Sequence, residues 1–237
     1  MVKKSKQLRS SSNQDISSFI TQAKKAPLPV QAGKNDGRLV FAMDATASRE
    51  PTWRLAQQIQ QDMFGVVSDL GTLDIQLCCF RGEAEFIAFP WGRDAITLRG
   101  YMQEVICRMG LTQINRVLRH TVRQCREQKI NALVYVGDCV EESPENLIQQ
   151  AGQLALNGVP AFMFQEGHDP LARMTFKKIS EVTHGAYSAF DAGSAQQLRE
   201  LLTAVAVYAT GGKKALLEYA GEDTKRLEPV IKQLTKR

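Results

Sequence analysis

The sequence has few of the features that announce a function directly. Its 237 residues include only three histidines, and no apolar run approaches the roughly 18 residues that would span a membrane. It contains neither a GxxxxGK[ST] nor a GxGxxG phosphate loop, and no GxSxG elbow. These absences remove the common nucleotide-binding loops and elbow-type hydrolases from consideration. The basic start, residues 1–14, is not followed by an apolar h-region, so we expect a cytoplasmic protein without a secretory signal.

Paired cysteine motifs are also missing. The cysteine count is odd, and no two cysteines have CxxC spacing. A zinc site or a disulfide framework would need such pairs, so the sequence predicts reduced thiols, mostly in the core. The five residues concerned are Cys78, Cys79, Cys107, Cys125 and Cys139.

Charge is slightly unbalanced, with a net charge of +5 at pH 7. Much of the excess lies at the two ends, in residues 3–9 and 225–237. No aromatic side chains alternate with these basic residues to stack on bases, so we expect solvated ends and no nucleic-acid partner. The apolar fraction of 43% and the charged fraction of 23% are ordinary for a globular protein.

Composition along the chain divides it into three parts. Residues 1–36 form a basic, largely disordered extension in which 15–26 can make a short helix. Residues 37–210 carry the regular apolar patterns of a folded domain, and residues 211–237 are expected to form a helical tail.

Within the domain, continuous apolar strands alternate with amphipathic helices. The pattern predicts a doubly wound α/β fold: a mostly parallel six-stranded sheet with helices on both faces. Two strands meet in a hairpin around Gly82, which predicts one antiparallel edge strand. The predicted strands are 38–43, 73–80, 83–89, 132–137, 159–165 and 186–190, and the helices are 51–64, 97–108, 113–128, 143–158, 169–185 and 194–210.

Acidic and hydroxyl side chains follow the predicted strands. Asp44 ends the first strand, and Thr46 and Ser48 follow at alternate positions. Asp138 follows the strand at 132–137, and Thr112 lies in the loop before the helix at 113–128. Ligands of open α/β sheets bind beyond the carboxyl ends of the strands, so we expect these side chains to meet there.

Such a set offers only oxygen ligands. It suits a hard cation, Mg²⁺ first, and Mn²⁺ or Ca²⁺ also fits. Because three of the five ligands are neutral hydroxyls, the bound ion keeps part of its charge. The sequence therefore predicts a metal site that takes one more anionic oxygen from outside the chain.

The segment "DATAS", together with "GLT" and the strand-end "GD", resembles the metal-ion-dependent adhesion site of the von Willebrand factor type A (VWA) domain. The resemblance covers about residues 37–210 and implies a doubly wound fold. It implies that Thr46, Ser48 and Thr112 contact the metal, with Asp44 and Asp138 acting directly or through water. Two positions depart from the family pattern: Thr46 replaces the usual Ser, and Cys139 stands where Gly is common.

The resemblance also implies a function. VWA-like domains bind a partner's acidic side chain through the metal, so we expect a protein-interaction module and not an enzyme. Bacterial cytoplasmic members often act beside ATPases or chaperone-like proteins in assembly or stress responses, which makes such a protein the expected partner. No membrane association is expected.

Three alternatives remain open at this stage. Asp44, Ser48 and Thr112 could be only strand-end or helix-capping residues. A Mg²⁺-dependent phosphatase could use Asp44 as nucleophile, although it usually needs a second Asp where this chain has Thr46. The domain could also keep the fold as a scaffold without any metal.

Other polar residues lie near the expected rim of the site. Glu141 and Glu142 either extend the cation site or are loop acids, one of which favours the helix that follows. Glu166 and His168 follow a later strand and could contact a partner. His120 falls on the polar face of its helix among basic residues, a face that is either solvated or docks an acidic partner.

Overall fold

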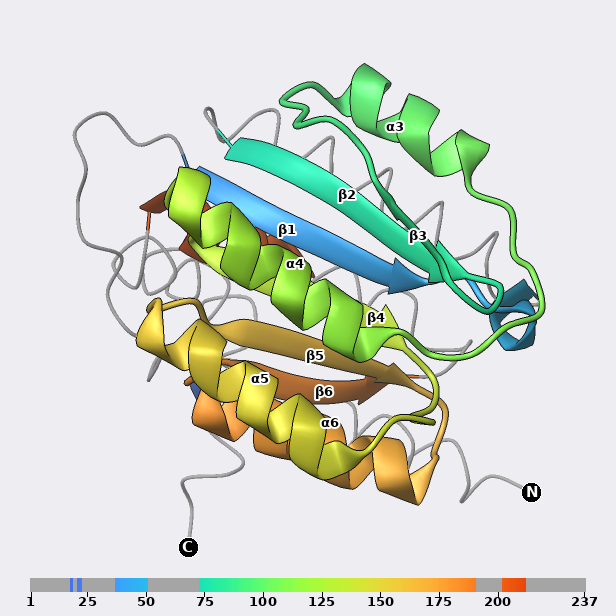
Figure 1. The fold of residues 1–237 in the computed structure, drawn as a ribbon. Helices are drawn as coiled ribbons and strands as arrows, with labels where there is room; N and C mark the ends of the chain where they lie inside the picture. The colour runs from blue at the N-terminus through green and yellow to red at the C-terminus, as the bar shows by residue number, and fades with distance from the viewer. Residues whose placement is uncertain (1–17, 19–20, 23–36, 51–72, 191–201, 212–237) are drawn as a thin grey trace, which may run out of the picture.

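The computed structural model describes residues 18, 21–22, 37–50, 73–190 and 202–211. Within these ranges one six-stranded sheet has the order β3-β2-β1-β4-β5-β6. Only β3 runs antiparallel, against β2, and every other neighbouring pair is parallel (Figure 1). The predicted doubly wound sheet with one antiparallel edge strand is confirmed. Its strands are β1 (Gly37–Asp44), β2 (Leu73–Arg81), β3 (Glu85–Ala88), β4 (Ala132–Gly137), β5 (Ala161–Glu166) and β6 (Ala186–Phe190).

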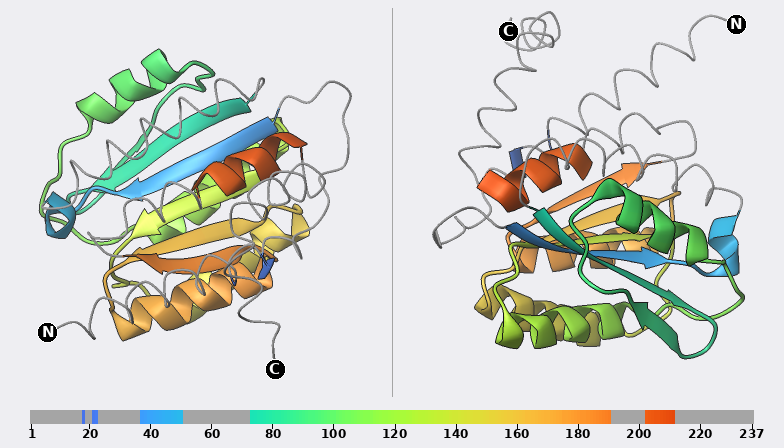
Figure 2. Two further views of the ribbon diagram at one scale, coloured as in Figure 1. Left: turned by 180° about the vertical axis from the view of Figure 1, so that it is seen from behind. Right: turned by 90° about the horizontal axis from the view of Figure 1, so that it is seen from above.

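Helices cover both faces of the sheet (Figure 2). One face packs against α4 (Ile114–Glu127), α5 (Pro144–Leu156) and α6 (Pro170–Val182). The other packs against α3 (Ala95–Glu104) and the helix over 202–211. Gly37 at the start of β1 lets this last helix approach closely, because a Cβ there would lie 2.4 Å from the carbonyl oxygen of Ala209.

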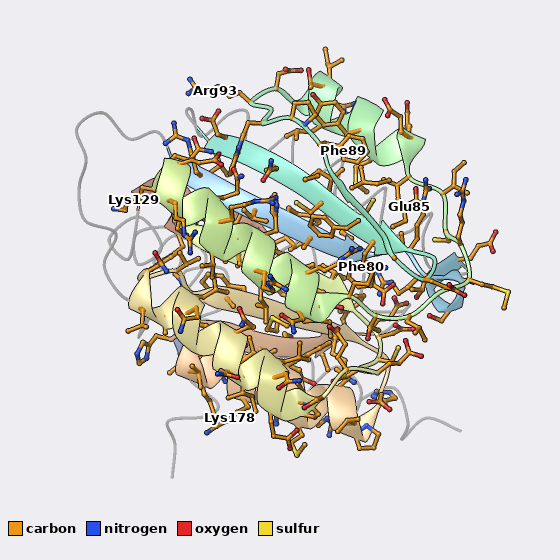
Figure 3. The ribbon with its side chains drawn as sticks, viewed as in Figure 1. Phe80, Glu85, Phe89, Arg93, Lys129 and Lys178 are labelled. Carbon is orange, nitrogen blue, oxygen red and sulfur yellow. The ribbon has the colours of Figure 1, made fainter. Side chains whose placement is uncertain are left out.

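The central strand explains why both faces need cover. Successive side chains of a strand point to opposite faces. In β1, Leu39, Phe41 and Met43 enter one apolar cluster while Val40 and Ala42 enter the other, and all five are fully buried. Figure 3 shows side chains between the layers and Lys178 on the outer side of α6, and Phe80 of β2 belongs to the same apolar cluster as the inner side chains of α4.

Local capping signals set the helix boundaries largely as the sequence predicts. The Ser143 side chain accepts a hydrogen bond from the backbone N–H of Asn146 and begins α5. Asp169 does the same for α6, accepting from the N–H of Ala172 at 2.6 Å. Gly158, just past α5, has a positive φ of 67°, a left-handed conformation that glycine adopts without strain.

One predicted helix is shorter than expected. The pattern over 97–108 predicts a helix to its end, but α3 stops at Glu104 and Val105 is extended. Residues 105–113 instead form a loop along the carboxyl edge of the sheet. The helices predicted at 15–26 and 51–64 and the tail at 211–237 lie largely outside the described residues, as does the first part, 194–201, of the helix predicted at 194–210.

The five cysteines are free, as the absence of paired motifs predicts. Among the described residues, no helix combines the length and the apolar character needed to cross a membrane.

Candidate metal centre

The candidate site lies at the carboxyl ends of β1 and β4, where the chain leaves these two neighbouring strands toward opposite sides of the sheet. β1 pairs with β2 on one side and with β4 on the other, and its Met43 is in register with Val136 of β4. Asp44 and Asp138 follow these two residues closely, so both carboxylates are placed at the same edge. Each of Asp44, Asp138 and Cys139 offers a ligand atom, and these atoms lie within 4.8 Å of one another. Across the described residues, this is the single group of three or more His, Cys, Asp or Glu side chains so arranged.

The turn after β1 holds the hydroxyl residues in place. The N–H of Thr46 donates to Oδ1 of Asp44 at 2.7 Å, and the Thr46 and Ser48 hydroxyl oxygens lie 3.1 Å apart. The turn is anchored on both sides, because Ala45 donates its N–H to Phe80 and accepts from the N–H of Arg108. The alternate spacing therefore does place the two hydroxyls together.

Two carboxylate oxygens at this edge are left without partners. Oδ2 of Asp44 and Oδ1 of Asp138 are buried and accept no hydrogen bond. A buried polar atom without a partner is costly and uncommon in folded proteins, and a carboxylate oxygen more so. Two such atoms facing the same small region fit a hard divalent cation, which takes carboxylate and hydroxyl oxygens.

Burial dominates the electrostatics of Asp44. Desolvation raises the pKa of its carboxyl from the ordinary 3.8 to about 6, and the nearby charge of Asp138 adds to this. The hydrogen bonds from Thr46 act in the opposite direction. Burial, with the charges of Asp138 and Asp44, likewise raises the pKa of the Cys139 thiol. A cation at this position would reverse these penalties.

Thr112 is tied to the loop that follows β4. Its N–H donates to Oε2 of Glu141 at 2.8 Å, and its hydroxyl accepts from the N–H of Glu141 at 3.0 Å. The hydroxyl does not cap α4, whose N-cap residue Gln113 also makes no side-chain capping bond. The capping alternative for Thr112 is therefore wrong, while its role as a ligand remains a prediction.

Glu142 supplies the missing cap. Its two carboxylate oxygens accept from the N–H groups of Ile114, at 2.5 Å, and Asn115, at 2.9 Å. An acidic side chain at a helix N-terminus is favourable because the free N–H groups carry partial positive charge. Glu142 thus serves the helix before it in the chain, not the helix after it, while Glu141 is exposed in its loop and accepts the hydrogen bond from Thr112.

The remaining rim residues differ from each other. Glu166 forms an ion pair with Arg49, whose side chain is fully buried in η1 (Ala47–Arg49). Arg49 also acts on Asp44, where its charge lowers the pKa. His168 is exposed, and neither it nor Glu166 belongs to the potential ligand group found among the described residues. A partner-binding role for either remains a prediction.

Several residues of the site escape the sequence pattern. Tyr135 points its hydroxyl toward the edge, where it meets no hydrogen-bond partner and feels the charges of Asp44 and Asp138. A Cβ at Gly137 would lie 2.6 Å from that hydroxyl, so glycine leaves room for it. The continuous apolar run of β4 predicts the strand, but nothing in that run indicates that the Tyr135 hydroxyl lies near the acids.

Fold and site together define the class of this protein: a doubly wound α/β domain with a cluster of two carboxylates and a thiol at its topological switch point. Comparison with solved structures identifies the fold as VWA-like. No protein-family model and no curated protein matches the sequence.

Three solved structures illustrate the likeness. A von Willebrand factor type A protein from Catenulispora acidiphila has a TM-score of 0.57 and 17% identity over 73% of this chain. An aerotolerance-related membrane protein from Bacteroides fragilis has a TM-score of 0.54 and 13% sequence identity. The match covers 70% of this chain and 98% of that protein. The SpRpn10 VWA domain has a TM-score of 0.55 and 13% sequence identity, and the match covers 70% of this chain and 93% of that domain. This chain covers only 43% of the Catenulispora chain.

Proposed function

We propose that this chain is a protein-interaction module that holds a divalent cation at its sheet edge and binds a partner's carboxylate through it. The cation would be held by Asp44, Thr46, Ser48, Thr112 and Asp138. The observation that carries the proposal is the pair of buried, unpartnered oxygens on Asp44 and Asp138. Mg²⁺ suits this oxygen set best, with Mn²⁺ or Ca²⁺ next.

An incomplete ligand set is what makes such a site adhesive. Two carboxylates and three neutral hydroxyls leave the cation short of one strong ligand. A partner Asp or Glu would complete the shell, so affinity for the partner would depend on the metal. Cys139 brings a sulfur close to the carboxylates, and it makes Zn²⁺ the competitor that a binding experiment has to include.

Exposed apolar side chains beside the site support a protein as the partner. Ile106, Met109 and Leu111 are 63%, 85% and 54% exposed. All three belong to the loop that leads to Thr112 and is hydrogen-bonded to the turn after β1. Exposed apolar groups next to a polar site are typical of interaction surfaces.

The cellular setting is proposed by analogy alone. We place the protein in the bacterial cytoplasm, as an assembly or stress-related adaptor whose partner is an ATPase or chaperone-like protein. The shared fold with an aerotolerance-related protein supports the stress-related setting.

Calorimetric titration tests the metal site. Mg²⁺, Mn²⁺, Ca²⁺ and Zn²⁺ are titrated into the full chain, into Asp44→Ala and into Asp94→Ala. Asp94 is an exposed aspartate that caps α3, so it is a matched control away from the site. We expect heat of binding from the wild type and the control and none from Asp44→Ala. Equal traces from all three proteins would refute the metal site.

Affinity capture with the same three proteins tests the interaction. A partner should be retained in Mg²⁺ by the wild type and by Asp94→Ala, and released by EDTA or by Asp44→Ala. Retention that ignores both treatments would refute a metal bridge. Hydrolysis of an aryl phosphate that disappears in Asp44→Ala would instead establish the phosphatase alternative.

A further inference from the structure

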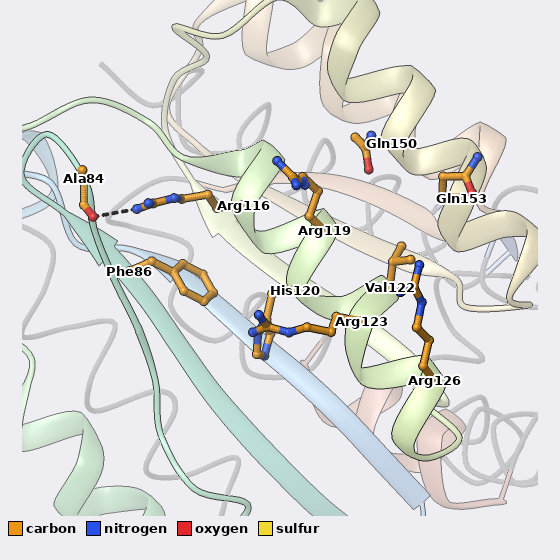
Figure 4. A pocket seen from close by; sticks show the side chains of 10 residues that line it. All are labelled: Ala84, Phe86, Arg116, Arg119, His120, Val122, Arg123, Arg126, Gln150 and Gln153. Atoms are coloured by element: carbon orange, nitrogen blue, oxygen red, sulfur yellow. Dashed lines mark hydrogen bonds between the residues drawn. The ribbon is translucent and has the colours of Figure 1, made fainter.

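A second charged feature lies on the outer face of α4. Four arginines recur along this helix at intervals of three and four residues, and all four are exposed: Arg116, Arg119, Arg123 and Arg126. This spacing puts them on one face of a helix. They line a pocket of about 780 Å³ between α4, the β2–β3 hairpin and α5 (Figure 4).

In the described part of the chain, Glu127 of α4 is the acidic side chain next to these arginines, and it does not line the pocket. Among the described residues, none of the four arginines forms an ion pair with a carboxylate. The described residues that line the pocket include no Asp or Glu, and α5 contributes the neutral amides of Gln150 and Gln153. Like charges three or four residues apart destabilise a helix slightly, so an anion in the pocket would relieve repulsion within α4.

Neutral acceptors hold two of the arginines in position. Arg116 donates to the carbonyl oxygen of Ala84 at 2.6 Å and to Oε1 of Gln113 at 2.8 Å. Arg123 donates to Nδ1 of His120 at 3.0 Å. These bonds orient the guanidinium groups without cancelling their charge. The side chains are therefore partly ordered before any ligand arrives, which lowers the entropic cost of binding.

His120 is part of this support. The helical pattern places it on the polar face, but its side chain is buried, because Phe86 of β3 packs over it with ring centroids 5.3 Å apart. Burial and the charge of Arg123 lower the pKa of His120 to about 4, so the ring is neutral at physiological pH. Nε2 then donates to Oε1 of Gln76 at 2.8 Å, and Nδ1 accepts from Arg123.

We propose that this arginine groove binds an acidic segment of a protein, through pairing of its carboxylates with the guanidinium groups of α4. From Arg116 to Arg126 the helix rises about 15 Å, at 1.5 Å per residue. An extended peptide of about five residues covers that length. Guanidinium groups pair with carboxylates in a two-pronged geometry, which favours arginine for this task.

A protein segment fits the groove better than a nucleic acid does. Single-stranded nucleic acids are bound by stacking bases on aromatic side chains as well as by charge. Among the described residues that line the pocket, the aromatic rings are those of Phe86 and His120. Phe86 is half-buried and packs on the imidazole of His120, so it is not free to stack on a base. The amides of Gln150 and Gln153 can instead bond to a peptide backbone. The groove shares no residue with the candidate metal centre, so this proposal stands without the metal.

The test uses a fluorescent oligoglutamate peptide and polarisation, with the full chain in EDTA. Arg119→Gln/Arg126→Gln removes two charges whose side chains form no hydrogen bond or ion pair among the described residues. Arg173→Gln/Lys178→Gln removes two exposed charges from α6, of which Lys178 pairs with Glu181, and is the control for an equal loss of charge away from the groove. We expect the first pair to weaken binding by about tenfold or more and the control to change it by less than about twofold.

Three results would overturn the proposal. The wild type could fail to bind oligoglutamate even at low ionic strength. Neutral oligoglutamine could bind equally well. Oligothymidylate of the same net charge could bind more tightly and lose affinity in Arg119→Gln/Arg126→Gln, which would make the groove a nucleic-acid site. Circular dichroism of each variant confirms that the fold is kept, and persistence of binding in EDTA separates this groove from the metal site.

Discussion

Replacing Asp44 by Asn should make the metal-free protein more stable at pH 8 while removing its capacity for metal. In the metal-free fold, Asp44 is a buried carboxylate whose Oδ2 has no hydrogen-bond partner. Asn has nearly the same shape and no charge, and its Oδ1 can still accept from the N–H of Thr46. The substitution therefore removes a desolvation penalty and keeps the turn.

The size of the effect follows from the pKa. Burial raises the pKa of Asp44 from 3.8 to about 6 in the folded chain. A difference of about two units corresponds to about 3 kcal/mol of stability. Because the folded pKa is the higher one, this contribution is fully present below pH 3.8 and is lost as the pH rises through about 6. At pH 8 in EDTA, Asp44→Asn should therefore be more stable than the wild type by this amount.

Thermal unfolding in EDTA at pH 5 and pH 8 measures this directly. A stabilisation of about 3 kcal/mol raises the midpoint by about 6–12 °C in a chain of this size. Asp94→Asn is the matched control, because backbone N–H bonds lower the pKa of Asp94 and its charge is favourable. The control should not gain stability at pH 8.

Bound Mg²⁺ should reverse the order of stability, so that the wild type becomes more stable than Asp44→Asn. With Mg²⁺ at a thousand times its dissociation constant, the wild type gains about 4.1 kcal/mol, which exceeds its deficit of about 3 kcal/mol, and Asp44→Asn gains nothing. The reasoning is refuted if Asp44→Asn is less stable than the wild type in EDTA at pH 8, or if both proteins respond equally to Mg²⁺.

Two further substitutions, Arg49→Met near the site and Gly185→Ala at the opposite end of the sheet, test the packing of the fold by urea unfolding. Arg49→Met leaves a buried carboxylate without its cation and should cost about 3–5 kcal/mol, whereas the exposed Arg173→Met should cost almost nothing; a small loss at Arg49 would contradict a structural ion pair. Gly185→Ala should cost about 1–3 kcal/mol, since a Cβ there would lie 2.0 Å from a strand carbonyl oxygen. Gly152→Ala, in open space on α5, should instead gain about 0.5–1 kcal/mol, and equal effects at the two glycines would be the contrary result.

The order of strands and helices was readable because the signals that define it are local. β4 matches its apolar run from residue 132 to residue 137, and Ser143 and Asp169 cap the helices that their positions predict. The end of α3 was not readable. Ile106 and Cys107 extend the apolar helical pattern, but the chain leaves the helix at Val105 to reach the sheet edge.

The sequence predicts only those residues of the site that follow the ends of strands. Their meeting at one edge follows from topology, which the strand pattern implies. The contacts that organise the edge are between residues far apart in the sequence. Glu142 caps a helix that begins 28 residues earlier, and Arg49 pairs with Glu166 across 117 positions. No local pattern encodes such pairs, so the sequence predicts neither the Glu142 cap nor the pairing of Arg49 with Glu166.

The two proposed sites select the same kind of partner by opposite means. At the sheet edge, the unpartnered carboxylate oxygens would bind a cation, and the cation would bind a carboxylate of the partner. In the groove, the unpaired guanidinium charges call for carboxylates directly. A single acidic protein that reached both would be bound twice, and the second contact would form at high effective concentration. EDTA would then weaken such a complex without abolishing it, and only the combination of EDTA with Arg119→Gln/Arg126→Gln would release the partner fully.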